Sequence, residues 1–268
     1  MNILFIHQNY PAQYKHLLDW LGPQGKHRIV FLTQAKQVPK VGTHQIIQYQ
    51  PRHKLERNAY AISRHFEASC AAGETVAETC RALDQKGFRP DVVIGHSGWG
   101  ETLFIKQVWP KVPVLSYFEY FYSPHDSCMD FDPEFPLTKS SELAISARNA
   151  VNYLSHAAAT AGQTPTAWQR DTYPESFHAK IRVLHEGIDT RRIKPNPKVS
   201  AKLGRLDRPV TRQDEIFTYA ARNMEPVRGF HVFMRALPDI LAARPNSRAL
   251  IIGGNDVSYG AKADEKGG

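Results

Sequence analysis

Short apolar runs alternate with longer helical stretches along the first half of the chain, and this alternation limits the possible folds more than any other feature. Short buried strands that alternate with helices imply a parallel β-sheet covered on both faces. The pattern therefore predicts an α/β protein whose first domain is built on a parallel sheet. We expect strands at 2–7, 27–33, 44–49, 91–95 and 112–118, and helices at 55–85 and 141–161.

Ligands of such sheets bind beyond the carboxyl ends of the strands, so the loops after the first, fourth and fifth strands are the candidate site. His96 ends the fourth expected strand, and we expect the next helix to start there. This histidine could contact a ligand or could be bonded to the backbone of a tight turn. Trp99, in the same loop, could contact a ligand or pack in the core.

A second unit begins near residue 196, after a first domain at 1–195. Prolines and a polar run predict a linker or mobile loop at 196–215. Residues 216–268 would then form one strand–helix–strand unit, with strands at 216–220 and 249–252 and a helix at 229–243. We expect Pro238 to bend or end that helix. A unit of this size buries its own apolar faces poorly, so we expect the chain to stop before its second domain is complete.

Two arginines six residues apart flank the start of the helix expected at 229–243. Arg222 and Arg228 carry planar guanidinium forks that match phosphate oxygens, and helix N-termini favour anions. The pair therefore indicates a site for a diphosphate. The alternative is that both are ordinary surface arginines in a connecting loop.

The net charge of +8 is concentrated in one segment. Residues 180–212 hold ten lysines and arginines against three acidic residues, a local net charge of +7. Such a segment can attract phosphate, anionic lipid or nucleic acid, and it can also be a solvated linker face.

Three cysteines without metal-ligand spacing argue against a disulfide scaffold or zinc finger and fit a reducing cytoplasm. No apolar run reaches the length of a membrane span, and the N-terminus has no signal-peptide pattern.

The run RNMEPVRGF at 222–230, followed by a strand ending in IIGG and preceded by LHEGIDT at 184–190, resembles the retaining glycosyltransferases of family 4. The resemblance implies a GT-B fold, in which two Rossmann-like domains flank a cleft. It implies transfer of a sugar, with retention and without a metal or cofactor, from a nucleotide-sugar donor to an acceptor hydroxyl. Arg222 and Arg228 match the basic pair that holds the donor diphosphate in that family.

The resemblance also suggests further site residues. Glu119 stands where the family often has a histidine near the sugar, a departure that weakens direct transfer of a catalytic histidine. The residues that we expect to be catalytic are Arg222, Arg228, Glu119 and His96. The remaining candidates are Gly229, Gly253, Gly254 and Glu186 on the donor side, and Asn9, Tyr10 and Trp99 on the acceptor side.

The sequence departs from the family at several positions. The family's Glu-x7-Glu motif does not follow residue 230, and the loop after the first strand lacks a glycine pair. We therefore expect a fragment, inactive by itself, of an enzyme longer by about a hundred residues.

Two further motifs have bland explanations. Asp130 and Asp132 form a DxD pattern that could bind Mg²⁺ or Mn²⁺, but we expect no metal there. The segment would be a mobile loop bordering the acceptor side or an ordinary surface loop. The run 165–169 is similar to a PTxWQ motif of related enzymes. We expect Thr166 to cap a helix and Trp168 to pack in the core.

The expected partners are a nucleotide-sugar donor and a saccharide or lipid-linked acceptor, with no nucleic acid. We expect a cytoplasmic location and leave open a peripheral contact with an anionic membrane at its inner face. Two alternatives stay open: a non-catalytic acceptor- or partner-binding module of GT-B fold, and an anionic-surface binder that uses residues 180–212.

Overall fold

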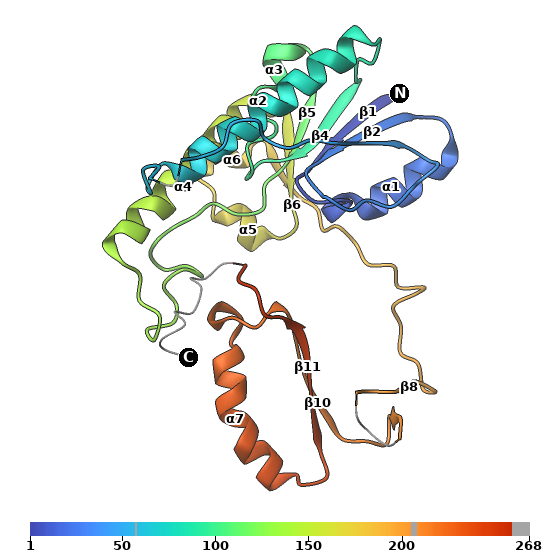
Figure 1. Ribbon diagram of the computed structural model, residues 1–268, viewed down its shortest axis with the longest axis vertical. Helices are drawn as coiled ribbons and strands as arrows, with labels where there is room; N and C mark the ends of the chain where they lie inside the picture. The colour runs from blue at the N-terminus through green and yellow to red at the C-terminus, as the bar shows by residue number, and fades with distance from the viewer. Residues whose placement is uncertain (57, 205–207, 259–268) are drawn as a thin grey trace. The chain divides into compact units, whose positions relative to one another are not determined.

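The computed structural model describes residues 1–56, 58–204 and 208–258 (Figure 1). These residues form two compact units. Unit 1 comprises Met1–Ser127 and Leu137–Gly187, and unit 2 comprises Cys128–Pro136 and Ile188–Gly268. Residues 205–207 of the basic segment and 259–268 of the expected second domain lie outside the described residues.

Unit 1 is built on a seven-stranded sheet in the order β3-β2-β1-β4-β5-β6-β7, and every pairing in it is parallel. The expected parallel α/β architecture is therefore confirmed. The strands are β1 (Asn2–Ile6), β2 (Arg28–Thr33), β3 (Gln45–Gln48), β4 (Val92–His96), β5 (Val114–Tyr117), β6 (Ala161–Thr164) and β7 (Ile181–Val183).

Helices cover both faces of this sheet (Figure 1). Side chains alternate along β1, so Ile3 and Phe5 pack on one face with Leu18 of α1, whereas Leu4 and Ile6 belong to the cluster on the other face. The helices are α1 (Lys15–Leu21), α2 (Arg64–Gln85), α3 (Ile105–Val108), α4 (Lys139–Ala158), α5 (Ala167–Asp171) and α6 (Glu175–His178), with 3₁₀ turns η1 (Ala12–Tyr14) and η2 (Gly22–Gln24).

Two helix predictions were wrong at one boundary, and a third was wrong about where a helix starts. The helix expected at 55–85 begins at Arg64, because the residues just before it form turns such as the Ser63 N–H to Tyr60 C=O bond at 3.1 Å. The helix expected at 141–161 ends at Ala158, since the next residues are extended and the Thr160 N–H donates to the Val114 C=O of β5 at 2.9 Å. No helix starts at His96, where turns lead to α3 instead.

Two glycines let α2 approach the turn that follows β4. Gly100 has φ of +89°, and a Cβ there would lie 2.2 Å from the Ser69 carbonyl oxygen of α2. A Cβ on Gly73, inside α2, would lie 2.6 Å from the Gly100 carbonyl oxygen. This packing fixes the loop that carries His96 against the helix layer.

Unit 2 contains a strand–helix–strand motif and a small antiparallel pair. β10 (Ile216–Asn223) pairs in parallel with β11 (Arg248–Gly254), and the 3₁₀ turn η3 (Pro226–Arg228) and α7 (Phe230–Ala243) connect them. The region expected as a linker at 196–215 contains the pair β8 (Ser200–Ala201) and β9 (Val210–Thr211).

The prediction that Pro238 bends or ends the second-unit helix was wrong about its end, because α7 continues to Ala243 with Pro238 inside it. Proline removes the N–H that would bond the carbonyl four residues earlier, here that of Met234. Met234 and Pro238 are both exposed, so water can solvate that carbonyl. Across the described residues, no helix is both long and apolar enough to cross a membrane.

Candidate functional site

The carboxyl edge of the unit 1 sheet gathers titratable side chains where the strand order reverses between β1 and β4. Ligands of open α/β sheets bind at such a switch point. β1 pairs with β4 so that Ile6 lies opposite Gly95, which brings His7 and His96 together with ring centroids 5.3 Å apart. β4 in turn places His96 opposite Tyr117 of β5.

His96 and Glu119 form a hydrogen-bonded pair at this edge. The Gly98 N–H donates to His96 Nδ1 at 2.9 Å, so in the neutral ring the proton sits on Nε2. His96 Nε2 then donates to Glu119 Oε2 at 3.0 Å. The His96 side chain is 2% exposed and that of Glu119 is 35% exposed, so the imidazole holds a carboxylate that solvent can reach. His96 thus both bonds the backbone of its turn and contacts Glu119.

His7 is a member of this cluster that the sequence analysis did not select. It is buried, and its Nε2 has no hydrogen-bond partner among the described residues. Burial first, and then the neighbouring imidazole of His96, lowers the pKa of His7 to about 3. The adjacency of β1 and β4 could have identified it, because His7 directly follows the first strand as His96 ends the fourth.

Glu186 and Tyr117 link the end of β7 to the same edge. The Tyr117 hydroxyl donates to Glu186 Oε1, and burial first, then this carboxylate, raises the pKa of Tyr117 well above its ordinary value. Glu186, expected on the donor side, thus lies in unit 1 beside the His96 and Glu119 region.

The three residues expected on the acceptor side differ in their surroundings. Asn9 bonds His7, its N–H lying 2.9 Å from Nδ1. The Tyr10 hydroxyl lies 2.9 Å from His44 Nε2 and its ring packs edge-on against Phe31. Trp99 is partly exposed with its ring centroid 5.8 Å from that of His96.

Unit 2 carries the two arginines at the start of α7. Arg222 is the second-last residue of β10, where its side chain is exposed and forms no hydrogen bond or ion pair with any residue that the structure describes. Arg228 closes η3, directly before Gly229, which is the N-cap of α7 with φ of +70°. Two guanidinium groups and a helix N-terminus are therefore present on one short stretch of unit 2.

Glu225 holds this stretch in place and was missed by the sequence analysis. Its residue is 2% exposed. Oε1 accepts from Arg228 Nε at 3.0 Å, and Oε2 accepts from the Ser258 N–H at 2.9 Å. One buried carboxylate therefore joins the loop after β10 to the loop after β11 and orients Arg228. The sequence does contain a signal for this role, because Glu225 lies between the two arginines.

Gly253 and Gly254 end β11 beside β10. A Cβ on Gly253 would lie 2.9 Å from the Ala221 carbonyl oxygen, and one on Gly254 would lie 2.7 Å from Asn223 Oδ1. Close approach of the two strand ends is thus a sufficient reason for glycine at both positions.

The segment Cys128–Pro136 packs in unit 2, although it lies between two elements of unit 1 in sequence. Asp132 Oδ2 lies 3.0 Å from His231 Nε2 of α7, and Arg235 donates to both oxygens of Glu134 at 2.6 and 2.7 Å. Asp132, Glu134 and His231 offer ligand atoms within 4.8 Å of one another. Because Arg235 already neutralises Glu134, we assign this cluster to docking of the segment on α7.

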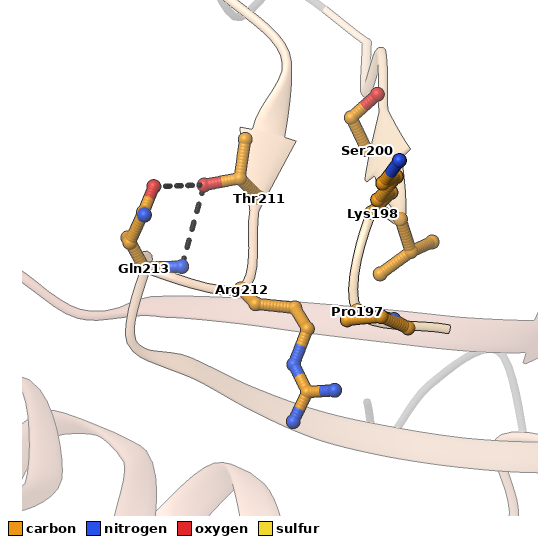
Figure 2. A pocket seen from close by; sticks show the side chains of 7 residues that line it. Pro197, Lys198, Ser200, Thr211, Arg212 and Gln213 are labelled. Atoms are coloured by element: carbon orange, nitrogen blue, oxygen red, sulfur yellow. Dashed lines mark hydrogen bonds between the residues drawn. The ribbon is translucent and has the colours of Figure 1, made fainter. Parts of the chain in front are cut away.

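The basic segment 180–212 is divided between the two units. Lys180 of unit 1 donates to the carbonyls of His156 and Ala159, and Arg208 of unit 2 pairs with Asp214. A cavity of about 220 Å³ lies between residues 197–200 and 211–213 of unit 2, and Lys198 and Arg212 line it (Figure 2).

Comparisons with known proteins place the chain in a family. The family model of the glycosyl transferase family 4 group matches residues 25–193, more than half of the chain. A comparison with curated proteins finds no match.

Solved structures share the fold at low sequence identity. The catalytic domain of starch synthase IV from Arabidopsis thaliana, bound to ADP and acarbose, is 12% identical with a TM-score of 0.56, over 96% of this chain and 69% of that one. UGT2 from Phytolacca americana, in its apo form, is 8% identical with a TM-score of 0.52, over 99% and 66%. UDP-GlcNAc 2-epimerase from Neisseria meningitidis, bound to UDP-GlcNAc, is 11% identical with a TM-score of 0.47, over 94% and 66%.

The chain thus spans 66–69% of the length of these three structures. At such identities the likeness shows the fold alone, which is of the GT-B type expected from the sequence. By its family match, the chain belongs to the glycosyl transferase family 4 group.

Proposed function

We propose that the protein transfers a sugar from a nucleoside diphosphate donor to an acceptor hydroxyl. The observation that carries the proposal is the stretch before α7, where Arg222 and Arg228 stand at the helix N-terminus and buried Glu225 orients Arg228. Membership of the glycosyl transferase family 4 group supports the same reaction.

The chemistry of the leaving group explains the need for these cations. When the bond between the sugar C1 and the diphosphate oxygen breaks, negative charge develops on the diphosphate. Guanidinium groups and backbone N–H groups that are already oriented stabilise that charge without further reorganisation. We assign Arg222 and Arg228 to the diphosphate, with Gly229 leaving the first N–H groups of α7 accessible.

We assign the acceptor to the unit 1 edge. Glu119, held by His96, can accept a hydrogen bond from the acceptor hydroxyl and orient its oxygen for attack on C1. The hydroxyl proton leaves as the new C1–O bond forms, and a leaving-phosphate oxygen takes it in the scheme that the family resemblance implies. Retention and independence from metal ions are part of the proposal on the same ground.

A nucleoside diphosphate donor is supported by what one of the similar structures holds. Starch synthase IV is described with ADP and acarbose. We carry over only the class of ligand, a nucleoside diphosphate, and the sugar that it bears in the donor remains part of the proposal.

The test is a transfer assay on the full-length protein with a panel of nucleotide sugars and acceptors. We expect Arg222→Ala to lower kcat/KM by about 100-fold, as loss of an oriented donor to a developing anion does. Excess EDTA should leave the wild-type rate unchanged. A rate that is insensitive to Arg222→Ala would remove the proposed role.

A second function, contact of the basic segment with an anionic surface, is supported by the cavity between Lys198 and Arg212 (Figure 2). Cosedimentation with phosphatidylglycerol vesicles should then fall steeply with salt and in a Lys198→Ala, Arg212→Ala double variant. Binding that neither change affects would exclude it.

A further inference from the structure

The run Pro165–Gln169 builds an exposed aromatic surface rather than part of the core. Thr166 caps α5 as expected, because its Oγ1 accepts from the Gln169 N–H at 3.2 Å. The expectation that Trp168 packs in the core was wrong, since Trp168 is 62% exposed. The helix is only five residues long, and its N-cap leaves the indole on the outer surface.

The orientation of the Trp168 ring is fixed from beneath. It stacks on Tyr120 with centroids 5.7 Å apart and planes at 24°. Tyr120 contacts Tyr122 edge-on at 5.2 Å, and its carbonyl accepts from Asn152 Nδ2 at 3.1 Å. The Arg148 guanidinium lies 4.7 Å above the Tyr122 ring. The outer ring therefore rests on a stack that is itself anchored to α4.

Trp20 shows what an exposed tryptophan without this support looks like. It is 68% exposed on α1 and has no aromatic ring contact among the described residues. A single exposed apolar side chain of that kind needs no explanation. The ring of Trp168 differs, because Tyr120 already holds it in one orientation. A ligand that binds it therefore does not have to order the indole first.

The same stack adjoins Glu119. Tyr120 follows Glu119 in sequence, and Gln169 Nε2 donates to the Glu119 carbonyl at 3.0 Å. The residue after the indole thus bonds the backbone of the residue that we assign to the acceptor hydroxyl. A flat aromatic face and a solvent-accessible carboxylate are thereby brought into one small area of unit 1.

We propose that Trp168, backed by Tyr120, is a stacking platform for a pyranose ring of a saccharide acceptor. The face of an aromatic ring is negative and attracts the weakly positive C–H groups on one face of a sugar, while the hydroxyls at the rim require polar partners such as Glu119. The carboxylate beside the ring favours a saccharide, and a lipid surface is an outcome that the experiment distinguishes. The inference rests on the proposed glycosyl transfer and names the class of acceptor.

The experiment is a glycan array probed with the full-length protein and three variants. We expect Trp168→Ala to weaken binding to the responding glycans by about 10-fold, the size of one aromatic stacking contact. Trp168→Phe should retain part of the signal. Trp20→Ala, a matched change at an equally exposed tryptophan, should leave it unchanged, and thermal melting verifies that all variants fold.

Three outcomes overturn the inference. In the first, no glycan binds the wild type; in the second, Trp168→Ala and Trp20→Ala have the same effect. In the third, Trp168→Ala loses binding to phosphatidylglycerol vesicles while its glycan signals are unchanged, which would indicate a membrane contact. Calorimetry with UDP, GDP and ADP on the same variants separates this failure from failure of the proposed function. If a nucleotide binds but Trp168→Ala leaves glycan binding unchanged, only the stacking platform is contradicted. If none of the three nucleotides binds, the proposed transferase function is contradicted.

Discussion

His96 Nε2 donates to Glu119 Oε2 at 3.0 Å, and the Gly98 N–H that bonds His96 Nδ1 fixes the ring tautomer for this contact. The pair joins a buried imidazole to an accessible carboxylate two residues beyond the end of β5. Whatever binds at this edge of the sheet therefore meets a carboxylate whose position is set from below.

We predict that Glu119→Gln lowers kcat by about 10-fold, because the neutral amide keeps the size of the side chain but accepts the acceptor's hydrogen bond more weakly than the carboxylate does. Glu175→Gln, at an exposed position of α6 in the same unit, is the matched control and should retain full activity. In a double-mutant cycle, His96→Ala should add little to Glu119→Gln, since His96 acts through that carboxylate. Full additivity of the two losses would contradict the pairing.

Removal of Glu225 should weaken diphosphate binding by about 10-fold, because Arg228 would lose the partner that orients its Nε. Calorimetry with UDP, GDP and ADP measures the effect. Combining Glu225→Ala with Arg228→Ala should give no more loss than Arg228→Ala alone. An effect of Glu225→Ala that persists in the Arg228→Ala background would show that Glu225 acts in another way.

The low pKa of His7 makes stability depend on pH. The folded protein keeps His7 neutral down to about pH 3, whereas the unfolded chain takes up the proton near its ordinary value of 6.5. The stability that the folded protein has with neutral His7 is therefore fully present above pH 6.5. As pH falls from 6.5 toward 3, the free energy of unfolding decreases by up to about 1.4 kcal/mol per pH unit.

Urea unfolding between pH 7.5 and 4.5 tests this. His7→Gln should flatten the decline of the unfolding free energy by up to that slope. His65, whose pKa burial lowers to about 4, contributes to the same window, so His65→Gln should flatten it as well. An unchanged slope in His7→Gln would mean that His7 takes up its proton in the folded state.

The contact between Gly100 and α2 predicts a large loss of stability in Gly100→Ala. Its new Cβ would meet the Ser69 carbonyl oxygen at 2.2 Å and would also face an unfavourable φ of +89°. We expect a loss of about 2–5 kcal/mol in the free energy of unfolding.

Gly87→Ala separates the two causes, because Gly87 has φ of +78° but no atom within 4 Å of the added Cβ. Backbone strain alone should cost about 1–2 kcal/mol there. Equal losses in the two variants, measured by urea unfolding, would show that the Ser69 contact is unimportant.

The sheet of unit 1 was predictable because its central strands are short apolar runs that alternate with helical stretches, and glycine and proline mark the ends of those stretches. The placement of Arg222 and Arg228 between a strand and a helix was predictable as well, because both elements have clear apolar patterns. The role of the pair in binding a diphosphate stays a prediction. His7 was not selected because its importance depends on which strands are neighbours, and strand order is not written in any local pattern. Glu225 escaped for a related reason: its partner at Ser258 lies after a different strand.

Trp168 illustrates a limit of residue type as a guide. An indole beside a capping threonine reads as a core residue, because most large aromatic side chains are buried. Its exposure follows from the shortness of α5 and from Tyr120, which occupies the position beneath it. The expectation that Pro238 ends its helix was wrong because the exposed carbonyl of Met234 tolerates the loss of its N–H partner.

The central claim is that Arg222 and Arg228 bind a nucleoside diphosphate, and calorimetry with UDP, GDP and ADP on the full-length protein tests it most directly. Arg222→Ala should weaken binding of the preferred nucleotide by about 10- to 100-fold, the loss of one charged hydrogen-bond donor. Arg244→Ala, which removes the same charge after the other end of α7 where Arg244 pairs with Glu215, should bind like the wild type. Binding that requires Arg222 but not Arg244 is the predicted result. Absence of binding to all three nucleotides, or equal losses in the two variants, would contradict the account.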